Sequence, residues 1–336
     1  MLSERLKSPP KKFKKFFIGL SGGKDSVVLL NLLIKKNKFN LDSTEEKQSI
    51  EAIHINHNLQ PDSKKFELFC IDLCKKVNVN LHTLSINIYG EDKKKLGVEA
   101  AARKYRYKAF SSILKNKDDC LVLAHHMDDQ LETVLLQWIR GAGLNGLTGM
   151  NFFSEKKIDE KKINIWRPML EFSKEEISDF IIEKNLSWID DPSNQNLNFD
   201  RNKIRSEVIP ILQSIREGSK KNMNRTIEHL QNTRLVIEEL LEENFNKCKC
   251  KNTKKDSESL LSKTELLKNS NIIIAFLLRI WLKKQECPMP PTSRLNEFIR
   301  QLKEAPYSKK VTLNVQNDSY NYSILVDEDE IKLLVN

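Results

Sequence analysis

Apolar and polar positions repeat with two different periods along the first half of the chain. Short apolar runs indicate buried strands, and each is followed by a stretch in which apolar residues recur every three or four positions, which indicates an amphipathic helix. The predicted strands cover residues 16–20, 50–56, 79–86 and 121–124, and the predicted helices cover 26–37, about 62–77, about 98–115 and about 129–140. This alternation predicts an α/β fold, a parallel sheet with helices on both faces.

The pattern changes after Pro210. Long, charged, helical sequence is followed by an apolar helix over 272–282, a proline break at 288–291, and strand-like runs at 311–315 and 331–335. We therefore predict two domains. The first, over 1–212, is the α/β domain, and the second, over 213–336, is mostly helical with a small strand-rich tail.

Composition adds a preference for anionic partners. The 336 residues carry a formal net charge of +10, with 56 Lys and Arg, and a field of this sign favours nucleic acid. The alternative is a general lysine bias. No apolar stretch approaches the ~20 residues of a membrane span, which predicts a soluble protein without a membrane partner. Six cysteines without Cys-x-x-Cys or zinc spacing favour the cytoplasm. Nothing in the sequence indicates the oligomeric state.

A glycine-containing loop follows the first strand directly. Paired glycines let the backbone approach an anion, and the following helix offers free N–H groups and the positive end of its dipole. The spacing does not fit a Walker A loop, and the alternative is an ordinary turn. The predicted nucleotide-binding residues are Ser21, Gly22, Gly23, Lys24, Asp25 and Ser26.

A second group of chemical residues follows the strand at 121–124. His125 and His126 stand at its end, and Asp129 and Glu132 share a face of the next helix. These acids could receive Mg²⁺ or an amine beside a nucleotide, or they could form a capping box. A zinc site is less favoured, because adjacent histidines ligate one ion less easily than a His-x-x-x-His pair.

Arginines provide a third group. Arg201 and Arg205 are four residues apart on a predicted helix, so they share a face and could clamp phosphate oxygens. The alternative is a solvated helix face.

Taken in order, these segments resemble the tRNA(Ile)-lysidine synthase family of the PP-loop ATP pyrophosphatase superfamily, in its compact form. The resemblance is dense over the first ~210 residues and looser beyond. It departs at Phe172-Ser173, where relatives often have an arginine. The matching segments are Ser21–Ser26, His54–His57, Glu99–Arg103 with Arg106-Tyr107, His125–Thr133, Arg140–Met150, Arg167-Pro168, Asp190–Asn194 and Arg201–Arg205.

The resemblance implies a PP-loop, adenine nucleotide alpha hydrolase-like fold and a two-step reaction. ATP would adenylate the C2 carbonyl of the wobble cytidine in a tRNA(Ile) with a CAU anticodon. The ε-amine of free L-lysine would then displace AMP, giving lysidine and changing the codon read from AUG to AUA.

The resemblance also implies residue roles. Asp25 would bind Mg²⁺ and act in catalysis, and His125 would assist proton transfer. Asp129 and Glu132 would hold the lysine amine and act in catalysis. Arg103, Arg201 and Arg205 would contact substrates, and the second domain, over 213–336, would bind tRNA.

Two other functions stay open at this point. A sulfur-inserting tRNA enzyme of the same superfamily would share the loop but would use cysteines. A non-catalytic nucleotide-sensing RNA binder would release no AMP.

Overall fold

The computed structural model describes residues 2–39, 48–56, 63–192, 199–250, 260–305, 310–317 and 320–335. The motif residues His57, Ser193 and Asn194 lie outside these ranges. Two compact units, Met1–Leu230 and Gln231–Asn336, divide the chain within one long helix. The functional boundary predicted at residue 212 stays a prediction.

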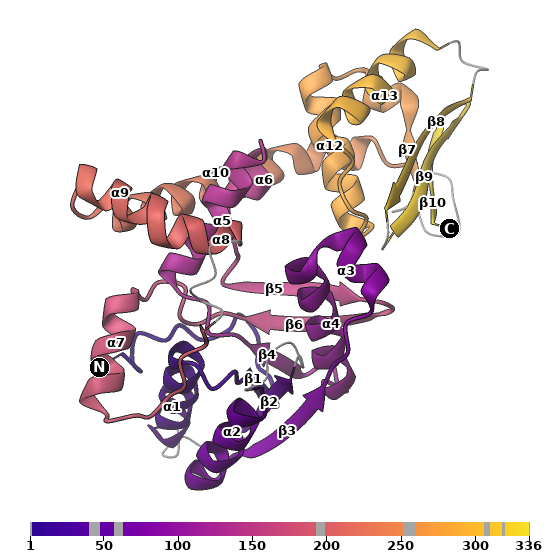
Figure 1. Ribbon diagram of the computed structural model, residues 1–336. Helices are drawn as coiled ribbons and strands as arrows, with labels where there is room; N and C mark the ends of the chain where they lie inside the picture. The colour runs from indigo at the N-terminus through magenta and orange to yellow at the C-terminus, as the bar shows by residue number, and fades with distance from the viewer. Residues whose placement is uncertain are drawn as a thin grey trace. The chain divides into compact units, whose positions relative to one another are not determined.

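The first unit contains a six-stranded sheet (Figure 1). Its strands are β1 (Lys15–Gly19), β2 (Ser49–Asn56), β3 (Asn80–Ser85), β4 (Asp119–Val122), β5 (Phe153–Ile158) and β6 (Lys161–Trp166). Their spatial order is β3-β2-β1-β4-β6-β5, and only β5 runs antiparallel to its neighbour. The predicted parallel sheet is confirmed, whereas the β5–β6 hairpin at its edge was not predicted.

Helices follow the strands in the predicted rhythm. They are α1 (Lys24–Phe39), α2 (Ser63–Val77), α3 (Gly90–Leu96), α4 (Val98–Ile113), α5 (Met127–Ile139), α6 (Leu144–Leu147), α7 (Lys174–Glu183), α8 (Asp200–Lys203) and α9 (Ile209–Ile215), with a π-helical turn over Ile204–Val208.

Two apolar clusters cover the two faces of this sheet. Because successive side chains of a strand point to opposite faces, Phe16 and Ile18 of β1 pack with residues of α1, α2 and α7. Phe17 packs on the other face with Tyr107 and Phe110 of α4. The helices therefore lie on both faces, as predicted, and the carboxyl ends of the strands stay available for a ligand.

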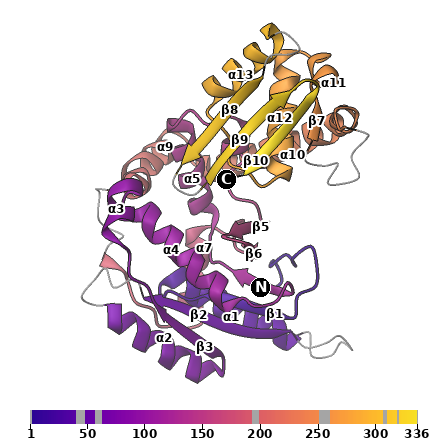
Figure 2. The same cartoon turned by 90° about the vertical axis from the view of Figure 1, so that its right-hand side faces the viewer.

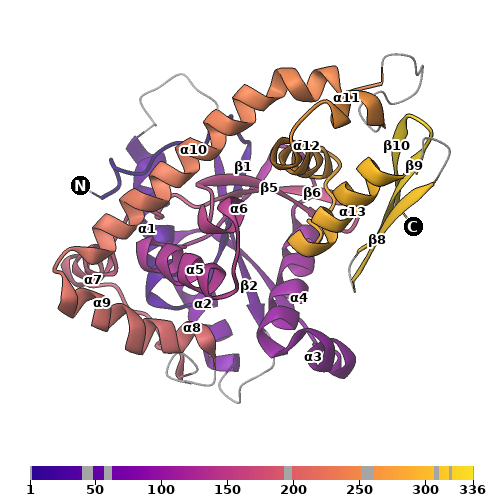
Figure 3. The same ribbon diagram turned by 90° about the horizontal axis from the view of Figure 1, so that it is seen from above.

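The second unit begins within α10 (Ser219–Lys247), which Figure 3 shows as one continuous helix. Its remaining elements are β7 (Leu260–Ser262), α11 (Lys263–Leu267), α12 (Asn271–Lys284), α13 (Thr292–Glu304), β8 (Val311–Asn317), β9 (Tyr320–Asp327) and β10 (Glu330–Val335). The strands form an antiparallel sheet in the order β7-β10-β9-β8, whose face is visible in Figure 2.

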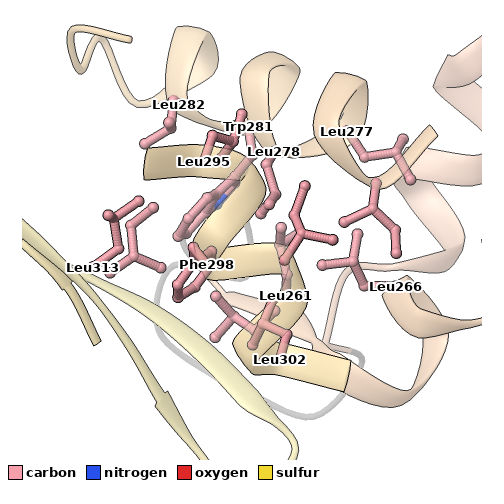
Figure 4. Packing of buried hydrophobic residues seen from close by; sticks show 14 of the residues in the cluster. Leu261, Leu266, Leu277, Leu278, Trp281, Leu282, Leu295, Phe298, Leu302 and Leu313 are labelled. Carbon is pink, nitrogen blue, oxygen red and sulfur yellow. The ribbon is translucent and has the colours of Figure 1, made fainter. Parts of the chain in front are cut away.

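A separate core holds the second unit together. Trp281 of α12 and Phe298 and Leu302 of α13 are buried against the sheet residue Leu313 (Figure 4). Each large apolar side chain removed from water stabilises this unit by roughly 1.5–3 kcal/mol. The predicted helical region with a strand-rich tail is thus confirmed. Within the described ranges, no helix is both long enough and apolar enough to cross a membrane.

Candidate nucleotide-binding and catalytic site

The loop between β1 and α1 is folded by its own serines. The backbone N–H of Ser21 donates to Ser26 Oγ at 3.2 Å, and Ser26 Oγ donates to the carbonyl of Gly23 at 2.9 Å. The N–H of Gly23 donates to Ser21 Oγ at 3.2 Å. Gly22 has a φ of +86°, which favours glycine. The two serines therefore shape the loop.

Two neighbouring segments fix the loop from outside. The N–H of Ile189 donates to the carbonyl of Gly22 at 3.0 Å. The ammonium of Lys24 lies 3.4 Å from Ser178 Oγ and 5.1 Å from the ring centroid of Trp188. The segment around Trp188 and Ile189 thus holds a loop that is preorganised for phosphate.

A cleft of about 800 Å³ opens at the carboxyl ends of β1, β2 and β4, a volume within the range of small-molecule sites. Most of the predicted loop and several residues from distant segments line it together. The predicted residues that line it are Ser21, Gly23, Lys24, Asp25, Ser26, His125 and Arg205. The described lining does not include Gly22, Arg103, Asp129, Glu132 or Arg201.

His126 connects the loop to α5. Its Nδ1 accepts from the N–H of Asp128 at 3.2 Å, so we assign the ring proton to Nε2. This Nε2 lies 3.7 Å from Asp25 Oδ2 and 3.5 Å from Asp129 Oδ2. Asp129 Oδ2 also accepts from the N–H of His126 at 3.0 Å. The capping box of α5 is therefore formed by His126 and Asp129, one turn before the predicted box of Asp129 and Glu132. The carboxylates of Asp25 and Asp129 both lie near the same imidazole.

Glu132 and the two arginines form a buried network beside Asp129. Arg201 Nε donates to Glu132 Oε2 at 2.6 Å. Arg205 Nε donates to Glu132 Oε1 at 2.6 Å, and Arg205 Nη2 donates to Oε2 at 3.0 Å. Arg201 Nη2 donates to Asp129 Oδ1 at 3.0 Å. Burial lowers the pKa of both arginines, but the two carboxylates outweigh it and the net pKa is raised.

The protonation of this site is set by burial and by charge. Burial, together with Arg167 and Arg103, lowers the pKa of His125 to about 3, so its imidazole is neutral at pH 7. Burial would raise the pKa of Asp129, but His126, His125 and Arg201 hold it at about 2. Burial raises the pKa of Asp25. The site therefore combines an anionic Asp129 with a neutral His125.

Asp25 fits a role as a magnesium ligand. Its side chain is 41% exposed at the loop exit, and His126 brings Asp129 close to it. Mg²⁺ is commonly bound by one or two carboxylates together with substrate phosphates. The described residues contain no group of three or more His, Cys, Asp or Glu that could hold a metal by themselves.

Sequence reasoning missed Lys174, although a signal for its position exists. Ser173-x-x-Glu176 is a capping box: Ser173 Oγ accepts from the N–H of Glu176 at 3.2 Å, and Glu176 accepts from the N–H of Ser173 at 2.9 Å. This box starts α7 and places Lys174 in the lining of the cleft. Phe172 is buried.

The cysteines of the first unit are neutral thiols. Burial raises the pKa of Cys70 and of Cys120 to about 12 and that of Cys74 to about 11. Since the thiolate is the nucleophile and the metal ligand, these residues give no support to the sulfur-inserting alternative.

Comparisons with known proteins agree with the loop and the fold. Residues 2–212 match a family described as the PP-loop domain, and residues 261–316 match the TilS substrate binding domain. A tRNA(Ile)-lysidine synthase from Wigglesworthia glossinidia brevipalpis is 36% identical over 91% of this chain and 74% of its own length. One from Actinobacillus pleuropneumoniae is 32% identical over 90% of this chain and 66% of its own.

A solved structure supports the fold alone. The U34-tRNA thiolase NcsA from Methanococcus maripaludis, with its [4Fe-4S] cluster, is 20% identical, with a TM-score of 0.53. It covers 68% of this chain, and the match spans 76% of that protein.

Proposed function

Because the chain belongs to the tRNA(Ile)-lysidine synthase family, we propose that it joins lysine to C2 of the wobble cytidine of a tRNA(Ile) with a CAU anticodon, with ATP as the second substrate. The product, lysidine, changes the codon read from AUG to AUA. The observation that carries this proposal is the contact of Asp25 and Asp129 through His126, since it joins the phosphate loop to the acids of α5. The six free thiols agree with a cytoplasmic enzyme.

The loop supplies the site for the triphosphate. The N–H groups at the start of α1 and the ammonium of Lys24 neutralise phosphate charge. Asp25 would hold Mg²⁺, which would contribute positive charge at the phosphates when it is bound.

In the first step, the C2 carbonyl oxygen of the cytidine bonds to the α-phosphorus of ATP, and the bond to pyrophosphate breaks. Arg205 lines the cleft and can donate to the phosphate oxygens. Glu132 exposes none of its side chain and is bound by Arg201 and Arg205. We assign Glu132 a positioning role, since it orients these arginines.

In the second step, the lysine amine bonds to C2, and AMP leaves with the former carbonyl oxygen. Lysine is protonated in water, and the anionic Asp129 attracts its ammonium group. A base must take a proton from the amine before it attacks. We assign His125 the relay of this proton to water, because its imidazole lines the cleft and has a buried Nδ1 without a hydrogen-bond partner among the described residues. With a pKa of about 3, the ring passes the proton on and does not hold it.

The test incubates the protein with ATP-Mg, labelled lysine and a tRNA(Ile) transcript with the CAU anticodon. We expect label on the wobble nucleotide and one AMP per lysine. The matched control transcript carries uridine at the wobble position and should gain no label. Nucleotide binding without AMP release would contradict the proposal and would favour a non-catalytic binder.

The half-reactions can be separated in the Asp129→Asn variant. We expect a raised KM for lysine, because the charge that attracts the ammonium is removed, while tRNA-dependent release of pyrophosphate is retained. Loss of both steps to the same degree would assign Asp129 to the nucleotide instead.

A further inference from the structure

Cationic side chains surround the buried phenol of Tyr107, on the face of the sheet that α4 covers. Arg103 Nη2 donates to the Tyr107 hydroxyl at 3.5 Å, and the guanidinium lies 5.3 Å from the ring centroid. The ammonium of Lys156 on β5 lies 4.2 Å from the same centroid. Arg167, which follows β6, also interacts with this phenol. Tyr107 is 2% exposed, whereas Arg103 is half-buried and Lys156 is exposed, so these charges extend from a buried phenol to the surface.

Acidic side chains of the described residues neutralise only part of the positive charge of this cluster, where Glu99 acts on Arg106. In the described part of the chain, no carboxylate forms an ion pair with Arg103, Arg106, Lys156 or Arg167. Arg167 Nη1 donates to the carbonyl of Asn151 and to Ser154 Oγ, but its buried Nε has no hydrogen-bond partner among the residues that the structure describes. A donor buried without a partner is costly, so this guanidinium still offers a hydrogen bond to a ligand.

The electrostatics agree with this geometry. Burial would raise the pKa of Tyr107, yet the four surrounding cations hold it below its usual value. Burial lowers the pKa of Lys156, and Arg103, Arg167 and Arg106 lower it further. Each cation therefore destabilises the others, and an anion placed among them would be stabilised by all four.

The cluster is adjacent to the cleft but separate from the phosphate loop. Arg106 lines the cleft, and so does His125, whose pKa the cluster residues Arg167 and Arg103 help to lower. In the sheet order β1-β4-β6-β5, the loop follows β1 and His125 follows β4, whereas the cluster belongs to β6, β5 and α4. A triphosphate in the loop would therefore leave this second cationic site open.

We propose that Arg103, Arg106, Lys156 and Arg167 bind a phosphodiester of the RNA strand whose base enters the cleft at His125. This inference rests on the proposed function, because it takes the substrate to be RNA. Guanidinium groups suit it, since they donate in a forked geometry to phosphate oxygens.

The test compares Lys156→Gln and Arg103→Gln with the wild-type chain. Binding of the tRNA(Ile) transcript is measured between 50 and 200 mM salt, and binding of ATP and of inorganic pyrophosphate is measured in parallel. We expect each variant to weaken tRNA binding about three- to tenfold and to reduce the slope of log K against log salt by roughly 0.7–0.9, the value for one lost phosphate contact. ATP and pyrophosphate binding should stay within about twofold.

Lys157→Gln is the matched control. It removes the same charge from the next position of β5, whose side chain points to the opposite face of the strand, and it should leave the salt slope unchanged. Lys156 is exposed, so Lys156→Gln should fold. If Arg103→Gln fails to fold, the salt slope of Lys156→Gln alone tests the inference.

Three outcomes overturn the inference. An unchanged tRNA slope in Lys156→Gln excludes a phosphate contact, and a loss of ATP or pyrophosphate binding instead assigns the cluster to the nucleotide. If either of these two results is found while the wild-type chain makes lysidine, the proposed function stands and only the phosphate-binding inference fails. A wild-type chain that binds no tRNA overturns the proposed function as well.

Discussion

Glu132 and Arg205 are joined by two hydrogen bonds, from Arg205 Nε to Oε1 at 2.6 Å and from Arg205 Nη2 to Oε2 at 3.0 Å. The carboxylate exposes none of its side chain and also accepts from Arg201. A buried carboxylate paired in this way fixes the orientation of its partners, whereas the intact pair contributes little net stability, because desolvation offsets the attraction. Glu132 of α5 thus connects that helix to the segment that begins at α8.

Replacing Glu132 with Gln should impair both folding and activity. The change removes the buried carboxylate that the two arginines share and leaves Asp129 as their remaining counter-charge, so we expect a cost of about 3 kcal/mol. We expect a loss of this order in urea unfolding and a fall of at least tenfold in lysidine formation. Glu160→Gln, at an exposed position between β5 and β6, is the control. Undiminished lysidine formation by Glu132→Gln would remove Glu132 from the mechanism.

His125 should make the folded state sensitive to mild acid. Its pKa is lowered to about 3 by burial and by nearby arginines, against about 6.5 in an unfolded chain. Between these values the unfolded state binds a proton that the folded state does not, so stability falls as pH falls from about 6.5 toward 3. Above about pH 7 the residue contributes nothing to this dependence.

The His125→Asn variant isolates this contribution. Between about pH 6 and pH 4, its unfolding free energy should fall less steeply than that of the wild-type chain, by up to about 1.4 kcal/mol per pH unit. Asp129, whose pKa is about 2, acts only at lower pH, between about 4 and 2. Denaturant titrations at pH 7, 6, 5 and 4 measure the difference. If the unfolding free energies of the two proteins fall equally with pH, His125 is not the source of the pH dependence.

Gly22→Ala should damage the phosphate loop. A Cβ there would lie 3.3 Å from both Cys70 Sγ and Phe69 Cδ1, at a φ of +86°. A non-glycine residue at positive φ costs roughly 1–2 kcal/mol, and the contacts with α2 add to this. We expect ATP affinity to fall about tenfold or more, measured by calorimetry with a non-hydrolysable analogue.

Gly90→Ala is the matched control for this prediction. A Cβ at Gly90 meets nothing within 4 Å, so nucleotide binding should be unchanged. Equal losses in the two variants would mean that the effect is not specific to the loop.

The sequence predicted the elements whose signals are local. Strand and helix periods and the motif Ser21–Ser26 each lie within a few residues, so periodicity and loop chemistry reveal them. The β5–β6 hairpin was not predicted, because its strands are rich in charge and lack a continuous apolar run. Lys156 and Lys162 are two of these charged residues. The hydrophobic pattern of a short, charged hairpin at a sheet edge resembles that of a loop.

The pairing of the two arginines with Glu132 was not predicted, for a different reason. Arg201 and Arg205 were predicted as a phosphate clamp from their spacing, but their partner Glu132 lies 69 and 73 residues away. A π-helical turn also begins at Ile204, between them. Long-range contacts of this kind leave no local pattern, so the sequence identified the functional groups but not their partners.

The ion pair between Asp128 and Lys220 leads to the last prediction. Lys220, at the start of α10, lies 2.5 Å from Asp128 Oδ1, and the two side chains are only 15% and 7% exposed. Asp128 also accepts from the N–H of Lys174 at 3.3 Å. Burial lowers the pKa of Lys220, but Asp128 outweighs it and the net pKa is raised. The pair therefore joins α10 to the first turn of α5.

Lys220→Met should destabilise the first unit by about 3 kcal/mol, since it leaves Asp128 buried without its counter-charge. Lys221→Met, at an exposed neighbouring position, should cost less than about 0.5 kcal/mol. In the double variant with Asp128→Asn, the unpaired charge is gone, so the combined loss should be smaller than the sum of the single losses by at least about 1.5 kcal/mol. Urea unfolding of the four proteins measures this coupling energy. Strictly additive losses would show that the two side chains do not interact in solution.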